Sequence, residues 1–443
     1  MERMVRSLKA HETRESLAWF NWNISLRGVF ETICGGTTLV FTAFALVIGV
    51  PQDAMGYFTA IISFSCILQV LGMPLASRMR RRKRFILTVA LIEPILLITA
   101  VLLAPLLPAE LRPVSLGLAF FLASACLHLT RPYSDNWLAT TIPSGLRGRY
   151  IGQRLRLSSI AIIASTLVVG AGVELLGKTN GPGLAGLLIT GAIFGVAAAL
   201  TLVRATKPVV QEPAPFDPRD IGQVLRTKAF MRLTFGTVLY MFPFFFAGAY
   251  YQVFNLRVVE MRPWLIASMG VGYLVVKLLL TPALGRVCDR IGPRRLLWVA
   301  SPIYTAFFLC FPFAEPGRAW PIIVAWAFVA VADGIYGVAA PAALYGTVPA
   351  QGARPAYFAV FNLINLSCSA VGGMLAVPLL GLLNRIDWNL GPAHLGGYHL
   401  FYALCGVAMV PCTAALLLFP KPDPAVNIQP PTSNRQRPKP DVG

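Results

Sequence analysis

Apolar runs of twenty or more residues dominate the chain, and short polar segments separate them. A helix needs roughly 20 apolar residues to cross a bilayer core about 30 Å thick. Runs this long and this numerous are not the core helices of a soluble domain. The pattern therefore predicts twelve membrane-spanning helices, over residues 24–50, 56–77, 85–107, 114–140, 155–177, 182–204, 230–255, 263–287, 295–315, 320–346, 355–383 and 396–419.

Composition agrees with a chain that faces lipid. Hydrophobic residues make up 56% of the sequence and charged residues only 13%, whereas a soluble domain carries about 25% charged residues. The eight cysteines fall singly in or beside apolar runs, without the spacing of a metal or disulfide framework. We read them as packing residues and expect neither a metal nor another cofactor.

Basic residues cluster on one set of alternate loops. Residues 78–84 and 286–295 are the densest examples, and the opposite loops hold only scattered cations. Because cytoplasmic loops carry the excess of Lys and Arg, the rich side is predicted to be cytoplasmic. Both termini then lie in the cytoplasm of a multi-pass inner-membrane protein. The net charge of +19 is explained by topology, so no nucleic-acid partner is expected.

The pattern divides the chain into five parts. Residues 1–23 are predicted to be a cytoplasmic N-terminal segment, and 24–204 a bundle of six helices. A Pro-rich, charged loop over 205–229 leads to a second six-helix bundle over 230–419. The tail over 420–443 has no apolar period and is predicted to be disordered.

The two bundles repeat each other in sequence. Three matches occur in chain order at nearly one offset, which indicates a duplicated six-helix unit, a recurrent build of secondary transporters. The matched pairs are Arg27 with Arg232 (232 − 27 = 205), Tyr150 with Tyr357 (357 − 150 = 207) and Arg84 with Arg295 (295 − 84 = 211).

The segment GRVCDRIGPRR over residues 285–295 resembles the G-x-x-x-D-R-x-G-x-R-R signature of the major facilitator superfamily. With the twelve spans, the central loop and the repeat, the resemblance covers essentially the whole chain. It implies an all-α membrane protein of twelve helices in two pseudo-symmetric six-helix bundles. The first-half copy of the signature departs from the family pattern, with Pro74, Arg78 and Arg81 at the Gly, Asp and second Gly positions.

The signature also implies a cytoplasmic gate, formed by Gly285, Asp289, Arg290, Gly292, Arg294 and Arg295. The Asp289 carboxylate can accept from exposed N–H groups at a nearby helix start. In the first half, Arg78 stands where the family has the acid, and the resemblance packs the end of the fourth helix nearby. We therefore predict an Arg78–Asp135 ion pair. The alternative is that Arg78 only sets topology and Asp135 pairs with Arg131, one turn away.

Ionisable residues inside the predicted spans are the candidates for a solute or proton site, since their burial in lipid is costly. The resemblance lines a central cavity with the first, fourth, seventh and tenth helices. For each residue the alternative is pairing within a bundle, and Glu93 could merely satisfy backbone groups freed by Pro94. The predicted cavity residues are Glu31, His128, Arg131, Tyr240, Asp333, Tyr336 and, at the flank, Lys277; Glu31, His128 and Asp333 are the proton candidates.

Together these features predict a secondary active transporter, not an enzyme. It is expected to act as a monomer and to move a small polar or charged solute by alternating access, with a coupling proton. No Walker A loop is present to use ATP directly. A multidrug efflux carrier is the alternative, although the fifth span lacks the Gly-Pro motif of such antiporters. A non-transporting receptor or a membrane enzyme on the same fold is a further alternative.

Overall fold

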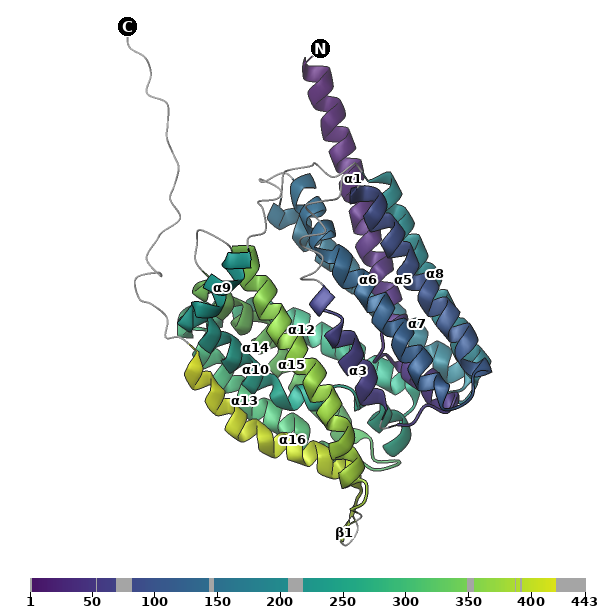
Figure 1. Cartoon of the computed structure of the whole chain (residues 1–443). Helices are drawn as coiled ribbons and strands as arrows, with labels where there is room; N and C mark the ends of the chain where they lie inside the picture. The colour runs from purple at the N-terminus through teal and green to yellow at the C-terminus, as the bar shows by residue number, and fades with distance from the viewer. Residues whose placement is uncertain are drawn as a thin grey trace.

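The computed structural model describes residues 2–52, 54–68, 82–142, 147–205, 218–348, 354–386, 388–390 and 393–419. Within these residues, eleven helices are long and apolar enough to cross a membrane (Figure 1). The predicted second span, 56–77, begins as the shorter apolar helix α3 (Met55–Phe64), and its residues 69–77 lie outside the described part. The prediction of an all-α, multi-pass membrane protein is confirmed.

The first half of the chain follows the predicted spans closely. Its helices run up and down between short connections, with α1 packed along α7 and α8, and α5 along α6 and α8. Besides α3, its elements are α1 (Glu2–Cys34), α2 (Leu39–Val47), α5 (Arg82–Leu103), the 3₁₀ turn η1 (Ala104–Leu106), α6 (Leu111–Thr141), α7 (Arg147–Leu176) and α8 (Gly181–Arg204).

The second half repeats this arrangement and adds one short hairpin, β1–β2, in which Asn389 pairs with His394. Its elements are α9 (Pro218–Arg226), α10 (Lys228–Ala247), α11 (Tyr251–Val253), the π-helix η3 (Phe254–Val258), α12 (Pro263–Ile291), α13 (Pro293–Leu309), the 3₁₀ turn η4 (Phe311–Phe313), α14 (Trp320–Thr347), α15 (Arg354–Leu383), β1 (Trp388–Leu390), β2 (Ala393–Leu395), α16 (Gly397–Thr413) and η5 (Ala414–Leu418).

Some element boundaries differ from those predicted. Residues 2–23, expected to precede the first span, are helical and continuous with it in α1. The predicted central loop, 205–229, contains the helix α9. The division into bundles at 24–204 and 230–419 stays a prediction.

The first and seventh spans are each broken near one end, which their apolar patterns did not predict. The first breaks between Cys34 and Leu39, where the Thr38 hydroxyl accepts from the Phe41 amide to start α2. The seventh breaks after Ala247 at Gly248. Gly36 and Gly248 are 248 − 36 = 212 residues apart, close to the offsets of the sequence repeat. The two breaks therefore occupy equivalent places in the two halves.

The repeated tyrosines perform equivalent roles. The Tyr150 hydroxyl, on α7, donates to the Leu17 carbonyl of α1 at 2.9 Å. The Tyr357 hydroxyl, on α15, shares a hydrogen bond of 3.0 Å with the Thr227 hydroxyl at the start of α10. Each tyrosine thus ties the start of its own helix to the first span of its half. Burial raises the pKa of Tyr150 to about 12, against the opposing charge of Arg154, so its phenol remains a donor at neutral pH.

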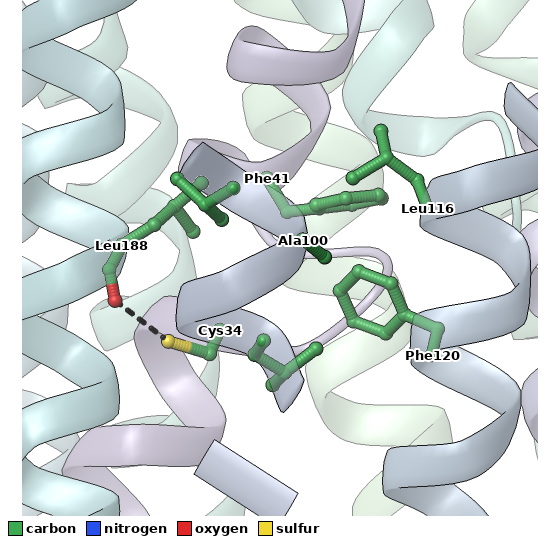
Figure 2. Close-up of a pocket in the computed structure, with 8 residues that line it drawn as sticks. Cys34, Phe41, Ala100, Leu116, Phe120 and Leu188 are labelled. Atoms are coloured by element: carbon green, nitrogen blue, oxygen red, sulfur yellow. Dashed lines mark hydrogen bonds between the residues drawn. The ribbon is translucent and has the colours of Figure 1, made fainter. Parts of the chain in front are cut away.

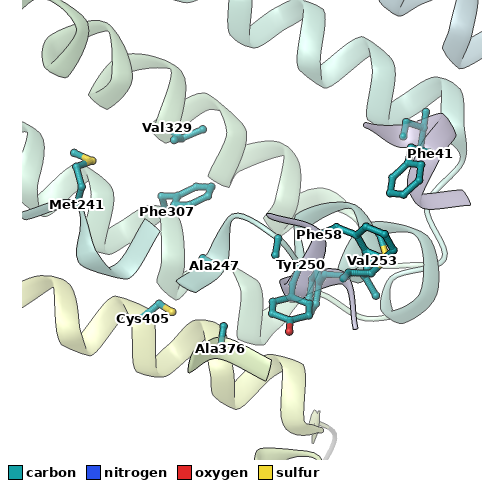
Figure 3. Close-up of a cluster of buried hydrophobic side chains, with 14 of the residues drawn as sticks. Phe41, Phe58, Met241, Ala247, Tyr250, Val253, Phe307, Val329, Ala376 and Cys405 are labelled. Carbon is teal, nitrogen blue, oxygen red and sulfur yellow. The ribbon is translucent and has the colours of Figure 1, made fainter. Parts of the chain in front are cut away.

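The two halves meet through α3 against α15 and α7 against α12. At Gly56 the backbones approach so closely that a Cβ atom would lie 2.8 Å from the Gly373 carbonyl and 2.6 Å from the Tyr250 hydroxyl. A Cβ atom at Gly170 would overlap Ala267. One continuous apolar cluster spans this contact, and Figure 3 shows Phe58 of the first half beside Tyr250 and Val253 of the second.

Polar contacts join the halves at the same end. Glu174, at the end of α7, accepts from the Trp264 amide at 3.0 Å and lies 4.0 Å from the Arg262 guanidinium. The Ser63 and Ser369 hydroxyls are 3.4 Å apart. The rest of α12 is poorly covered, since Cys288 is its one buried residue between Gly270 and Ile291. The halves are therefore closed together at the end predicted to be outside.

Candidate functional site

Asp333, near the middle of α14, is the centre of a polar cluster in the second half. Its two carboxylate oxygens accept hydrogen bonds from the hydroxyls of Tyr273, at 2.5 Å, and Tyr304, at 2.6 Å. The Lys277 ammonium donates to the Tyr273 hydroxyl at 3.2 Å. We call these four residues the aspartate cluster. It joins α12, α13 and α14.

Helix geometry explains how the cluster assembles. Tyr273 and Lys277 are four residues apart on α12 and therefore share one face. Their side chains also touch, with the ammonium 5.4 Å from the centroid of the tyrosine ring. Tyr304 is fully buried on α13. The packing of α14 against α12 and α13 then places Asp333 between the two phenols.

Two predicted cavity residues line this cluster without touching the carboxylate. The rings of Tyr240 and Tyr336 stack with centroids 6.3 Å apart, and Tyr240 lies edge-on to Tyr304. The Tyr240 hydroxyl donates instead to the Leu297 carbonyl. A polar group surrounded by aromatic side chains is the usual lining of a small-molecule site.

A second polar cluster lies in the first half. Arg27 on α1 forms a two-pronged ion pair with Glu93 on α5, at 2.9 and 3.0 Å, and a third bond to Glu31 at 2.8 Å. We call these three residues the arginine cluster. The Glu93 side chain is 8% exposed and that of Glu31 is 57% exposed. Glu93 is therefore held by a cation, and the reading that it merely satisfies backbone groups beside Pro94 is wrong.

The arginine cluster borders a cavity of about 260 Å³ inside the first half. Arg131 of α6 and Arg154 of α7 also line it, with Trp137 on its wall. His128 lies one turn before Arg131 and is buried, and its Nδ1 atom has no hydrogen-bond partner in the described structure. The predicted cavity residues thus form two groups, one in each half.

A second, much smaller cavity of about 10 Å³ is entirely apolar in its lining apart from one thiol. The Cys34 thiol donates to the Leu188 carbonyl at 3.2 Å, and Figure 2 shows Phe41 above this bond and Phe120 across the cavity from it. A space of this size and lining is a packing defect beside the break in the first span. It offers nothing to a polar solute.

The predicted cytoplasmic gate lies at the junction of α12 and α13. Gly292 ends α12 and precedes α13 with φ of 84°, a backbone conformation that favours glycine. The Asp289 carboxylate is exposed and forms no hydrogen bond or ion pair with any described residue. The gate formed by Gly285, Asp289, Arg290, Gly292, Arg294 and Arg295 stays a prediction for another facing state.

The predicted Arg78–Asp135 pair cannot be placed. Arg78 lies outside the described residues, and the side chain of Asp135, on α6, is likewise outside the described part. Pairing of Asp135 with Arg131 is untested for the same reason. Both alternatives stay predictions.

Residues 261–441 match the Major Facilitator Superfamily. Solved structures extend the likeness across both halves. A bacterial homolog of the human lysosomal transporter Spinster, inward-facing and occupied, has a TM-score of 0.69 at 16% identity, covering 94% of this chain and 98% of its own. The nucleoside transporter NupG has a TM-score of 0.65 at 12% identity, covering 93% and 99%.

A third similar structure is a POT family transporter in complex with a thioalcohol-conjugated peptide, with a TM-score of 0.65 at 12% identity and coverage of 92% and 96%. No curated protein matches the sequence. Across both halves the chain has the fold of these membrane transporters, and its second half matches the family model. The family match therefore covers the second half, and the likeness of the first half rests on the fold.

Sequence reasoning missed three residues of the two clusters. Tyr273 and Tyr304 are neutral at neutral pH, so a search for ionisable residues passes over them. Tyr273 nevertheless had a usable signal, because it stands one turn before Lys277 on the same helix face. Arg27 stands one turn before Glu31 on the polar face of the first span, but it is not among the predicted cavity residues, and its pairing with Glu93 joins residues 66 positions apart.

Proposed function

We propose that this transporter is a proton-coupled secondary carrier that moves a small polar or charged solute by alternating access. It works as a monomer in the cell inner membrane, with both termini in the cytoplasm. The observation that carries the proposal is the aspartate cluster. It holds an acidic group inside the membrane-spanning part through two neutral phenols.

A coupling carboxylate must bind a proton in one facing state and release it in the other. Asp333 suits this task because a tyrosine hydroxyl can donate to the ionised form or accept from the protonated form. Glu93 suits it poorly, since both of its oxygens are held by the Arg27 guanidinium in a bidentate ion pair. Glu31 also pairs with Arg27, so an argument of the same kind applies to it. Among Glu31, His128 and Asp333, we therefore choose Asp333 as the proton site.

The nature of the solute follows from the linings of both clusters. Each combines charged groups with aromatic or amphipathic walls, which suits a polar or charged molecule. The similar structures named above include a nucleoside transporter and one with a bound peptide conjugate. Molecules of this polarity and size support the same class of solute here.

The test is solute-driven proton movement in proteoliposomes that contain a pH-sensitive dye. A panel of nucleosides, dipeptides, sugars, amino acids and organic acids is added outside. We expect one member to drive proton movement in the unaltered protein. The Asp333→Asn variant should lose this movement while still exchanging solute across the membrane. Glu110→Gln, at an exposed acid outside both clusters, is the matched control.

Two results would count against the proposal. One is solute accumulation that never moves protons in the unaltered protein. The other is full proton coupling in Asp333→Asn, which would place the proton site elsewhere.

A further inference from the structure

The aspartate cluster combines a carboxylate that already accepts from two phenols with an ammonium that uses one of its three donors. We propose that Lys277 binds the acidic group of a small organic monoanion, and that Asp333 takes up one proton as the anion binds. The carrier would then move one anion with one proton and no net charge. This inference rests on the proposed function and adds to it the class of solute and the stoichiometry.

The number of hydrogen bonds that each group makes indicates which group of the cluster can bind a ligand. Both Asp333 oxygens already accept from phenols. The Lys277 ammonium has three N–H donors, and its one hydrogen-bond acceptor among the described residues is the Tyr273 hydroxyl. Two N–H groups remain for a ligand. A ligand that offers acceptors therefore fits the free donors of the lysine, whereas the ammonium repels a cationic ligand.

The lysine is partly accessible. Lys277 is half-buried on the stretch of α12 beyond Met269, where few side chains are buried. The neighbouring position on α14 is Gly337, where a Cβ atom would lie 3.7 Å from the Lys277 Cε atom. A Cβ atom there would be in ordinary contact with the lysine stem, so this glycine lets the α14 backbone lie close to Lys277.

The charges that face Asp333 explain the coupling. Tyr273 of α12 and Tyr304 of α13 contact it, and the rings of Tyr240 and Tyr336 lie behind Tyr304. Among the described residues that hydrogen-bond within this cluster, Lys277 is the one cation. Asp333 and Lys277 together then carry no net charge.

An anion bound at Lys277 would leave the cluster with one excess negative charge. Such a charge is costly in a medium of low dielectric constant. A proton taken by Asp333 from the same aqueous side removes this cost. Protonated Asp333 can donate its new O–H group to the Tyr273 oxygen, and the Tyr273 hydroxyl rotates so that it accepts this bond. Anion and proton thus bind together and leave together, which is symport without charge movement.

The experiment uses the full-length protein in proteoliposomes with the membrane potential clamped by potassium and valinomycin. The probes are the monoanions gluconate, N-acetylglycinate and methanesulfonate. Their uncharged counterparts are glucose, N-acetylglycinamide and methanesulfonamide, and choline is the cationic probe. We expect at least one anion, and none of its uncharged counterparts, to carry protons inward. The rate should be the same at clamped potentials of either sign.

Variants locate the site. Lys277→Ala should slow anion-driven proton uptake about tenfold or more, the effect of losing one charge-assisted hydrogen bond. Lys277→Arg should restore part of it. Tyr273→Phe should weaken proton coupling more than anion binding, because the bridge to Asp333 is lost. Arg286→Ala, which removes an exposed cation from the same helix, should transport like the unaltered protein.

Several results would overturn the inference. They are transport confined to neutral or cationic probes, absence of transport for every anion, a rate that follows the membrane potential, or full anion transport in Lys277→Ala. If a neutral or cationic probe still moved protons through Asp333, the proposed function would stand while this inference failed. If no solute moved protons, both would fail.

Discussion

At the scale of single residues, the two clusters differ in how their carboxylates are held. Glu93 meets a guanidinium directly, at 2.9 and 3.0 Å. Asp333 meets two phenols, and its nearest cation, Lys277, is one hydroxyl away. A direct arginine partner keeps an acid ionised, whereas neutral donors permit both states. The first-half cluster is thus suited to structural support, and the second-half cluster to proton exchange.

Removal of the buried partner of Arg27 should be costly. Glu93→Ala would leave a guanidinium only 22% exposed without its main partner, and we expect a loss of about 3–5 kcal/mol in stability. Glu31→Ala is the matched control, because it removes an exposed i, i+4 partner of the same arginine and should cost about 0.5 kcal/mol or less. Thermal unfolding of the detergent-solubilised protein measures both. Equal losses of stability in Glu93→Ala and Glu31→Ala would contradict the assignment of Glu93 as the main partner of Arg27.

At the scale of elements, the sequence repeat has a structural meaning. Tyr150 and Tyr357 hold the starts of α7 and α15 against the first span of each half. The breaks at Gly36 and Gly248 are also equivalent. Duplicated halves therefore conserve local ties between helices, although their polar clusters differ.

Each tyrosine tie should contribute modestly and independently to stability. Tyr150→Phe and Tyr357→Phe should each cost about 0.5–1.5 kcal/mol, the net value of one hydrogen bond. The double variant should lose the sum, since the two sites share no partners. Tyr57→Phe, at an exposed position, should change stability little in the same unfolding assay. A strongly non-additive double variant would show that the ties are coupled.

At the scale of the whole molecule, the halves close on each other at one end through close backbone contact. Gly56 and Gly170 permit this contact, since a Cβ atom at either would clash with the opposite half. A rocking carrier must break these contacts to open at that end. The same residues therefore set the balance between its facing states.

Side chains at this contact should shift that balance. Gly56→Ala and Gly170→Ala should destabilise the closed end by about 1–3 kcal/mol through overpacking, and so populate the state open there. Gly186→Ala is the control, because a Cβ atom at Gly186 meets nothing within 4 Å. Distances between spin labels at Thr179 and Arg318, in a background without native cysteines, report the opening. An unchanged distance distribution in both variants would refute the idea.

The sequence alone indicated a multi-pass membrane protein, the rough ends of eleven of its twelve predicted spans, the repeat and the resemblance to the family that the second half matches. Hydrophobic runs, basic loops and a short signature are local properties, so a single chain displays them directly. The same reasoning located Asp333, Lys277 and Glu31, because charge inside an apolar run is visible without a structure.

Only the tertiary structure decided which of these groups meet. Glu93 reaches Arg27 across 66 residues, and Asp333 reaches Tyr273 across 60. Such pairings depend on the rotation of each helix about its axis and on the angles at which helices pack. The periodicity of a single helix specifies neither. The breaks in the first and seventh spans were hidden for a related reason. An apolar run satisfies the bilayer whether its helix is continuous or broken, so the run alone does not show the breaks at Gly36 and Gly248.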